Sequence, residues 1–381
     1  MKISRRDFFA HSSGLLFSFA PFLNIRSSLL DAQVDYASRT GLSKGKNILV
    51  VIHLAGGNDW FNTVIPYNDH TYYSKRPNLA IDSNTVLKLN NDFAFHPALS
   101  EIKEIYDRNE VAILLNHGVF EQDLSHHKAI KIMQYRAIDQ NHTKTWQARY
   151  AELGKNELGD QNFHAINVEP LFYREDNALK EIKSRDKLVL SSLNASNNFE
   201  FNLDVHYQMG NKSRDLQGHV EHGFEFALKQ TAQLIARKTS DTVYHISLGG
   251  FDTHMDQLAQ HAYLLRMLSK GVHSFQADLD KCGFGDRVLT LICSEFGRSY
   301  QENDSKGTDH GYLNHVLAIG RSVKGGIYGN RYAQSANSSQ SNFARLQATT
   351  LSWLFCPSSA VLAQKKKLFH SFEEVFLPCT F

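Results

Sequence analysis

The chain has 381 residues, of which 42% are hydrophobic and 21% are charged, and its formal net charge at neutral pH is +2. A chain of this length and composition can bury a sizeable core, in one large domain or two modest ones. The charge is near neutral, and no dense stripe of Lys and Arg is interleaved with aromatic residues. We therefore expect no nucleic-acid partner.

The N-terminal segment has the features of an export signal. Arg5 and Arg6 are followed by Phe8 and Phe9, and then by a mildly apolar run too short to span a bilayer comfortably. This order predicts a twin-arginine signal over residues 1–32, a polar linker over 33–46, and a periplasmic or otherwise exported protein. The expected partners are the twin-arginine export machinery and, if the signal is not cleaved, the membrane through this segment alone. The alternative is a chance Arg-Arg pair before an ordinary amphipathic helix.

Apolar runs along the rest of the chain predict buried strands. These runs cover residues 47–54, 111–115, 187–190, 242–248, 287–292 and, more weakly, 316–319. Helical patterns lie between them, over residues 99–108, 124–136, 220–237 and 254–281. Strands that alternate with helices indicate an α/β fold, with a mostly parallel central sheet flanked by helices, in one domain over residues 47–381.

Polar clusters follow three of the predicted strands, at the edge where an open parallel sheet binds ligands, and the first two come after residues 54 and 248. In Gly56-Gly57-Asn58-Asp59, Asp59 offers a carboxylate to a metal, although a plain strand-to-loop turn is the alternative. In the second cluster, Asp252 and His254 combine a carboxylate oxygen with an imidazole nitrogen, which suits a divalent metal. Helix capping would explain Asp252 but not His254.

Two further clusters lie towards the C-terminus. Glu295 is a candidate metal ligand or an acceptor behind one, and Arg298 is a candidate clamp for an anionic substrate oxygen. A surface ion pair between the two is the alternative. Adjacent Asp309 and His310, between glycines in a loop with no evident core role, form the strongest local metal-binding signature.

Ser125 opens the helix predicted over residues 124–136. Free backbone N–H groups at a helix N-terminus favour an anion, so a metal-activated Ser125 hydroxyl is a candidate nucleophile. An N-cap is the alternative role for this serine. A third metal-binding histidine is not fixed by the sequence, and His117, His126 and His315 each remain open.

Taken in order, these clusters resemble the domain of unknown function 1501 family, whose members resemble the alkaline phosphatase/sulfatase superfamily in fold. The matching segments are Ser4-Arg5-Arg6, Gly56-Gly57-Asn58-Asp59, Asn62-Thr63-Val64-Ile65-Pro66-Tyr67, Ser125-His126, Gly249-Gly250-Phe251-Asp252-Thr253-His254, Ser294-Glu295-Phe296-Gly297-Arg298 and Gly307-Thr308-Asp309-His310-Gly311. The resemblance implies an alkaline-phosphatase-like α/β fold and a serine nucleophile at Ser125. It also implies one or two metal ions, held by Asp59, Asp252, His254, Asp309 and His310.

The expected function is therefore an exported, metal-dependent hydrolase of small phosphate or sulfate esters, with zinc, manganese or calcium as the metal. Glu295 completes the expected ligand set. The Cys-x-Pro-x-Arg pattern of conventional sulfatases is absent from the sequence. The alternative is a non-catalytic periplasmic protein that keeps the fold and binds a metal or a partner. Cys293 is expected to be a buried free thiol, and pairing of Cys356 with Cys379 is left open.

Overall fold

The computed structural model describes residues 47–116, 125–135, 162–168, 172–175, 178–181, 189–194, 221–236 and 243–329, together with Leu346, Thr350 and Trp353. The predicted signal segment and linker, His117 and the Cys356–Cys379 pair lie outside these residues. Within them, no helix is both long and apolar enough to cross a membrane.

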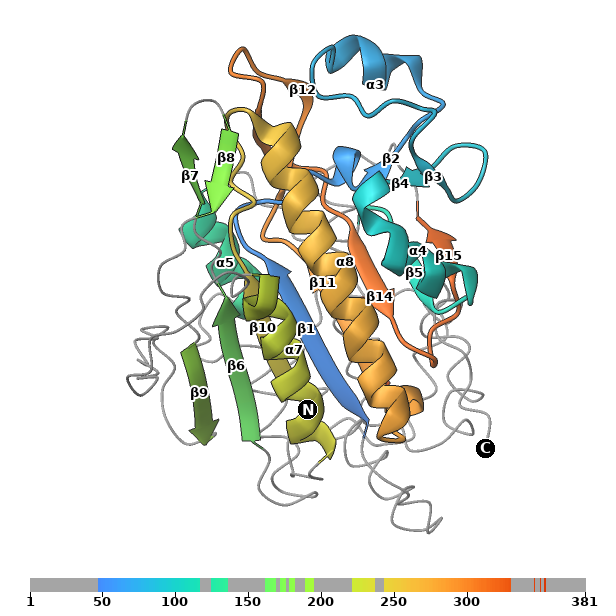
Figure 1. Ribbon diagram of the computed structural model, residues 1–381, viewed down its shortest axis with the longest axis vertical. Coiled ribbons are helices and arrows are strands. Elements are labelled where there is room, and N and C mark those ends of the chain that lie inside the picture. The colour runs from blue at the N-terminus through green and yellow to red at the C-terminus, as the bar shows by residue number, and fades with distance from the viewer. Residues whose placement is uncertain are drawn as a thin grey trace, which may run out of the picture.

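An eight-stranded sheet forms the centre of the molecule (Figure 1). In spatial order its strands are β15 (Gly326–Tyr328), β5 (Val111–Leu114), β14 (Val316–Ile319), β11 (Val288–Cys293), β1 (Ile48–Leu54), β10 (Val243–Leu248), β6 (Asn162–Val168) and β9 (Val189–Asn194). The four strands from β11 to β6 run parallel, whereas β14 and β9 are antiparallel to their neighbours. The expected α/β class with a mostly parallel sheet is thus confirmed.

The sheet is covered on both faces, which explains why its central strands are apolar without alternation. Val50 and Ile52 of β1 pack in one cluster with side chains of α4 (Ser100–Asp107), α7 (Glu221–Ala236) and α8 (Gln257–Lys281). Leu49 and Val51 face the opposite side, in a cluster with Met133 of α5 (His126–Tyr135). All four predicted helices are present, and Cys293 is a buried free thiol as expected.

The long helix α8 begins later than its apolar spacing predicts. Its first residue is Gln257, and Asp256 before it has a left-handed backbone with φ of 43°. The backbone N–H groups of Asp256 and Gln257 donate to the carbonyls of Ser305 and Lys306. Because this neighbouring hairpin takes the first donors, Asp252 and His254 lie in a loop ahead of the helix rather than in its first turn.

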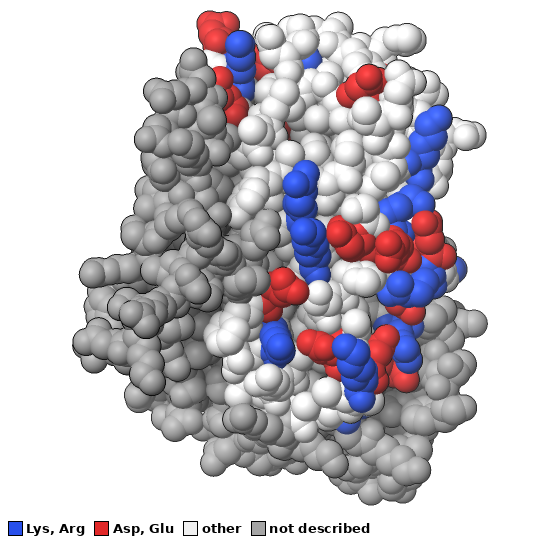
Figure 2. All heavy atoms as spheres, in the orientation of Figure 1, with Lys and Arg blue, Asp and Glu red and all other residues white. Residues whose placement is uncertain are grey.

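Smaller elements surround the carboxyl end of the sheet (Figure 1). They include a three-stranded sheet of β2 (Val64–Ile65), β4 (Ala94–Phe95) and β3 (Leu87–Lys88), the helices η2 (Trp60–Asn62), α3 (His70–Lys75) and η3 (Pro97–Leu99), and the hairpin of β12 (Gly297–Glu302) and β13 (Thr308–Gly311). The strands β7 (Phe172–Glu175) and β8 (Ala178–Glu181) pair separately, and η4 (Gly285–Arg287) precedes β11. On the described part of the face in Figure 2, acidic and basic side chains intermingle.

Candidate metal centre

Three adjacent parallel strands bring the site together. β11, β1 and β10 are neighbours in the sheet: β1 and β10 end at the paired residues Leu54 and Leu248, and β11 ends at Cys293, which pairs with His53. The segments that follow them therefore meet at one edge, where open α/β sheets bind ligands. Gly56 permits the closest approach: its φ is 117°, and a Cβ atom there would lie 2.3 Å from the backbone nitrogen of Asp252. Only glycine fits such a position.

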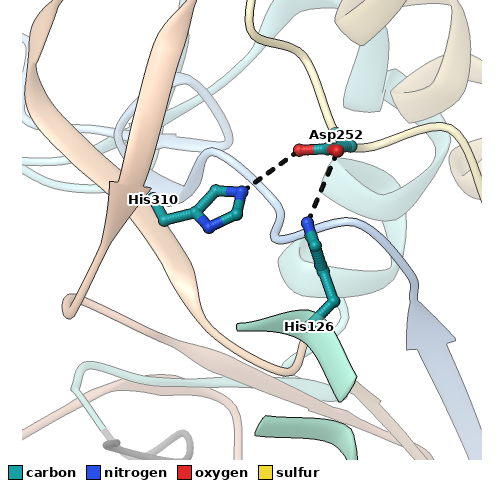
Figure 3. A group of neighbouring side chains, drawn as sticks. All are labelled: His126, Asp252 and His310. Atoms are coloured by element: carbon teal, nitrogen blue, oxygen red, sulfur yellow. Dashed lines mark hydrogen bonds and ion pairs between the residues drawn. The ribbon is translucent and has the colours of Figure 1, made fainter. Parts of the chain in front are cut away.

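His126, Asp252 and His310 form a group whose donor atoms all lie within 4.8 Å of one another (Figure 3). His126 opens α5, Asp252 lies in the loop after β10, and His310 lies on β13. The Asp252 carboxylate lies 3.4 Å from Nε2 of His126 and 3.3 Å from Nε2 of His310. Among the described residues this is the one group that offers three such donors at metal-binding spacing.

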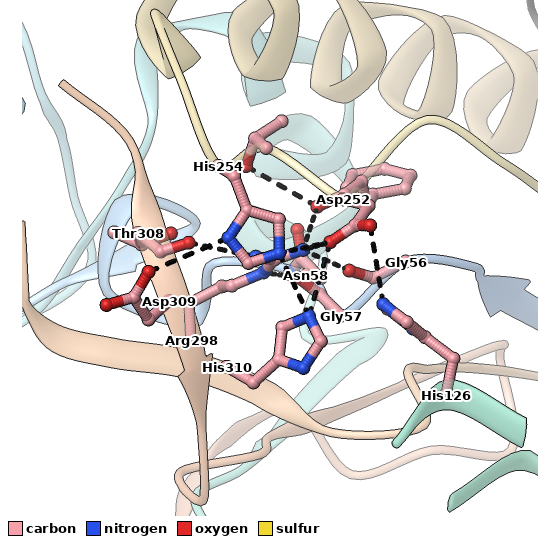
Figure 4. Close-up of polar contacts among 12 residues, drawn as sticks. Gly56, Gly57, Asn58, His126, Asp252, His254, Arg298, Thr308, Asp309 and His310 are labelled. Carbon is pink, nitrogen blue, oxygen red and sulfur yellow. Dashed lines mark hydrogen bonds and ion pairs between the residues drawn. The ribbon is translucent and has the colours of Figure 1, made fainter. Parts of the chain in front are cut away.

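His254 joins this group from the loop before α8 (Figure 4). Its Nε2 atom lies 3.0 Å from Oδ1 of Asp252 and 3.1 Å from Nε2 of His310. Its Nδ1 atom is 3.7 Å from Oδ1 of Asp309, whose side chain is 70% exposed. The structure thus brings Asp252, His254 and His310 together and adds His126, one of the three histidines left open by the sequence. Asp309 lies at the rim, behind His254.

Glu295 lies behind His126 rather than inside the group. Its Oε1 atom is 2.8 Å from Nδ1 of His126 and accepts a hydrogen bond from the backbone N–H of Gly56, also at 2.8 Å. Its Oε2 atom lies 2.9 Å from Nε2 of His53. Burial alone would raise the pKa of Glu295, but the hydrogen bonds to His126 and His53 hold it well below its usual range. Glu295 is therefore a buried, ionised acceptor.

One observation indicates that these residues fit a divalent cation. Nε2 of His126 is buried, faces Asp252 and forms no hydrogen bond within the part of the chain that the structure describes. A buried polar atom without such a partner is costly. The carboxylates of Asp252 and Glu295 raise the pKa of His126 to about 9. A bound cation would thus replace the His126 proton between two carboxylates.

Arg298 is buried, although the sequence suggested a clamp for substrate. Its side chain has 0% exposure, and its guanidinium N–H groups are directed at protein acceptors, including the carbonyls of Gly57 and Thr308 and the carboxylate of Asp252. Contact with a substrate oxygen would require these bonds to break. The geometry therefore disfavours the clamp role.

Asp59 lies apart from the histidines. Its side chain has 0% exposure, and both of its oxygens accept hydrogen bonds from Arg76. Gln257 donates a further hydrogen bond to Oδ2. Burial alone would raise the pKa of Asp59, but the Arg76 guanidinium holds it below its ordinary value. As placed, this carboxylate is committed to an internal ion pair, and the Asp59 ligand role gains no support from the geometry.

The Phe296 ring packs against two of the imidazoles. Its ring centroid lies 4.7 Å from that of His126 and 4.4 Å from that of His310. Gly57 makes room for this ring, since a Cβ atom there would lie 2.4 Å from Phe296 Cε2. The sequence shows that residue 296 is an apolar phenylalanine, but it does not show that this ring packs against the site.

Of the other candidates from the sequence, Ser125 lies next to the cluster and His315 lies in the core. Ser125 directly precedes α5, and its carbonyl accepts a hydrogen bond from the N–H of Ala129 at 2.9 Å. Its neighbour His126 is in the cluster, so Ser125 stands at the edge of the site. His315 is buried, and its Nδ1 accepts a hydrogen bond from the N–H of Asn116 at 3.0 Å. His315 contributes to the core instead.

Three of the solved structures that match this chain are distant from it in sequence. Ps i-CgsB in complex with k-i-k-neocarrahexaose is 10% identical, with a TM-score of 0.43, over 82% of this chain and 72% of that one. A protein in the alkaline phosphatase superfamily from Vibrio parahaemolyticus is 9% identical, with a TM-score of 0.35, over 75% and 63%. The C-terminal periplasmic domain of EcEptC from Escherichia coli, in complex with Zn, is 10% identical, with a TM-score of 0.36, over 73% and 74%.

No curated protein matches this chain in sequence. A family model described as "Protein of unknown function (DUF1501)" matches residues 180–366. That segment contains Asp252, His254 and His310 of the cluster, whereas His126 precedes it. The resemblance to this family that the motifs indicated is thereby confirmed over residues 180–366, a segment of just under half of the chain.

Proposed function

We propose that the protein is a metal-dependent hydrolase of phosphate or sulfate esters, with its metal held by His126, Asp252, His254 and His310. The observation that carries the proposal is the convergence of these four side chains, from three separate parts of the chain, around a buried and unbonded Nε2 atom. Helix caps or surface ion pairs do not require three imidazoles at one point.

The donor set narrows the choice of metal. Three imidazoles and one carboxylate suit zinc, and also manganese, whereas calcium prefers oxygen ligands throughout. The described residues form one such group, so the proposal needs one ion, and a second ion stays an expectation from the family resemblance. Glu295 would fix the His126 ring by accepting its Nδ1–H, an arrangement common behind metal-binding histidines.

Ser125 is the proposed nucleophile. Its oxygen would attack the phosphorus or sulfur atom, the bond from that atom to the ester oxygen would break, and the alcohol would leave with a proton. Water would then release phosphate or sulfate and restore the Ser125 hydroxyl. The N-terminal N–H groups of α5 would hold the anionic oxygens. A bound divalent cation would supply Lewis-acid polarisation and favour the deprotonated nucleophile.

Metal analysis together with turnover tests this proposal. Protein purified without chelator is expected to hold near-stoichiometric zinc or manganese, and His310→Ala is expected to lose it. Ser125→Ala should keep the metal and lose hydrolysis of phospho- or sulfo-esters. Metal retention without turnover of any such ester would favour the rival, a non-catalytic metal-binding or partner-binding protein. A folded wild type that takes up no metal would remove the hydrolase proposal.

Export is proposed on the sequence alone. Residues 1–46 fused to a fluorescent reporter are expected to direct it out of the cytoplasm, and the double substitution Arg5→Lys/Arg6→Lys should block this transport. Export that persists in the double variant would contradict a twin-arginine route.

A further inference from the structure

The buried guanidinium of Arg298 lies directly behind the candidate metal centre (Figure 4). We infer that Arg298 is a positioning residue, which sets the metal centre by joining the loop after β10, which carries Asp252 and His254, to strand β13, which carries His310, and to the segment after β1. This inference rests on the proposed function. It replaces the substrate-clamp role with one that acts through the ligands.

The Arg298 guanidinium donates hydrogen bonds to four backbone carbonyls. Nε donates to Gly57 at 2.7 Å, and Nη1 donates to Thr308 at 2.9 Å. Nη2 donates to Phe251 at 3.1 Å and also to Gly56. These acceptors belong to the segment after β1, the loop after β10 and the strand β13. An arginine has five N–H groups in a fixed plane, so it can join several acceptors without leaving one of them unsatisfied.

The same guanidinium contacts two of the proposed ligands. Nη2 donates to Oδ1 of Asp252 at 2.5 Å, and Nη1 lies 3.5 Å from Nε2 of His254. Its carbonyl partner Phe251 immediately precedes Asp252, and its partner Thr308 is two residues before His310. The side chain and backbone contacts together fix Asp252 relative to the strand that carries His310. Ligands held in place before binding lose less conformational freedom when the ion arrives.

Charge alone could also explain a role for Arg298, because a positive group beside Asp252 favours its ionised form. Burial would raise the pKa of Asp252, while the ion pair with His126 and the hydrogen bond from Arg298 hold it well below its usual value. Arg298→Lys separates the two explanations. Lysine keeps the charge but lacks the planar fork that reaches three segments at once.

Arg76 provides a matched control. It is also a buried arginine, and it donates to the carbonyls of Ser299 and Tyr300 on β12, the strand that carries Arg298. Its carboxylate partner is Asp59, and its other hydrogen bonds in the described part of the chain go to Asn62, Ser299 and Tyr300, none of which is a proposed ligand. Arg76→Lys should therefore destabilise the fold in a similar way without disturbing the metal centre.

The experiment compares zinc affinity, by competition with a chromophoric chelator, in the wild type, Arg298→Lys and Arg76→Lys, with urea unfolding of the zinc-free proteins beside it. Substitution of a residue that orients metal ligands typically lowers metal affinity about 10- to 100-fold, and we expect a loss of this size in Arg298→Lys only. Wild-type affinity in Arg298→Lys would overturn the inference, as would an equal loss in Arg76→Lys. A wild type that binds no zinc would count against the proposed function instead.

A second measurement applies if Arg298→Lys does not fold. Hydrogen exchange of the Arg298 side-chain N–H groups can be followed by NMR in the wild type, with and without zinc. We expect slow exchange already in the zinc-free protein, because the bonds to the carbonyls precede metal binding. Fast exchange that slows only when zinc is added would overturn the inference.

Discussion

Nδ1 of His126 lies 2.8 Å from Oε1 of Glu295, although 169 residues separate them in the sequence. The same carboxylate is held by the N–H of Gly56 and lies 2.9 Å from the ring of His53, so it is fixed from three sides. With Nδ1 engaged, Nε2 of His126 is the ring nitrogen that faces Asp252. Glu295 thus determines which nitrogen of His126 is offered to a metal, a relationship typical of carboxylate–histidine–metal sites.

We predict that Glu295→Gln lowers zinc affinity about 10- to 100-fold without releasing the zinc entirely at saturating concentration. The amide loses the charge that orients the His126 ring but keeps the shape of the side chain. Competition with a chelator measures the change. Glu104→Gln is the control, because Glu104 is 63% exposed and pairs with His273 on the surface. Complete loss of zinc binding in Glu295→Gln would instead indicate that Glu295 is itself a ligand.

Asp59 and Asp252 should respond in opposite ways to the same change. Asp59→Asn leaves the buried Arg76 without its carboxylate, and breaking a buried ion pair costs about 3–5 kcal/mol of unfolding free energy. Asp252→Asn also removes a carboxylate partner of buried Arg298, but Asp252 itself is 48% exposed, so we expect a smaller stability loss than in Asp59→Asn and a large loss of metal. Urea unfolding and metal analysis of both variants measure the loss of stability and the loss of metal separately. Loss of metal from a folded Asp59→Asn protein would restore Asp59 to the ligand set.

Most central strands of the sheet could be predicted from the sequence. The strands β1, β10 and β11 were predictable because strands buried on both faces are apolar throughout, and their order places the polar loops at one edge. Strand β6 was missed because Asn162, His164 and Asn167 interrupt its apolar run.

The roles of individual polar residues depend on partners far away in the chain. Asp59 and Asp252 both follow strands and are indistinguishable by type. Their environments differ because Arg76 covers Asp59 completely, whereas Asp252 faces His126 and stays half exposed. Similarly, Arg298 follows Glu295 closely in sequence, yet the carbonyls that bury it come from residues more than 200 positions earlier as well as from its own hairpin. Tertiary contacts of this kind leave no local pattern.

His245 makes the stability of the fold depend on pH. Burial lowers the pKa of His245 to about 3, with a smaller effect from His53, whose ring lies 6.0 Å away. In the unfolded chain the histidine pKa is about 6.5, so between about pH 3 and pH 6.5 the unfolded state binds more protons at this residue than the folded state does. The stabilisation from His245 is therefore complete above about pH 6.5 and decreases as the pH falls towards 3, by at most about 1.4 kcal/mol per pH unit.

We predict that His245→Leu reduces the loss of unfolding free energy between pH 7 and pH 5, measured by urea titration at each pH. Nδ1 of His245 makes no hydrogen bond within the described residues, so the leucine should cost little at pH 7. His261→Leu is the comparison. The pKa of His261 is also lowered to about 3 by burial, but its ring bonds Oδ1 of Asn58 at 3.0 Å. His261→Leu should share the weaker pH dependence yet lose about 1–3 kcal/mol at pH 7. Parallel curves for wild type and His245→Leu would contradict this account.

Two glycines with similar backbones test whether Phe296 supports the metal centre. Gly57 has φ of 78° and Gly283 has φ of 75°, so alanine is strained at both positions. At Gly283 an added Cβ atom meets nothing within 4 Å, whereas at Gly57 it lies 2.4 Å from the Phe296 ring. That ring lies under His126 and His310.

We predict that Gly283→Ala costs about 1 kcal/mol of unfolding free energy from backbone strain alone and leaves zinc affinity unchanged. Gly57→Ala carries the same strain but must also displace Phe296, so we expect a larger stability loss and weaker zinc binding. Urea unfolding and chelator competition on both variants provide the measurement. If Gly57→Ala bound zinc as tightly as Gly283→Ala while losing more stability, Phe296 would serve the core and not the position of the two imidazoles.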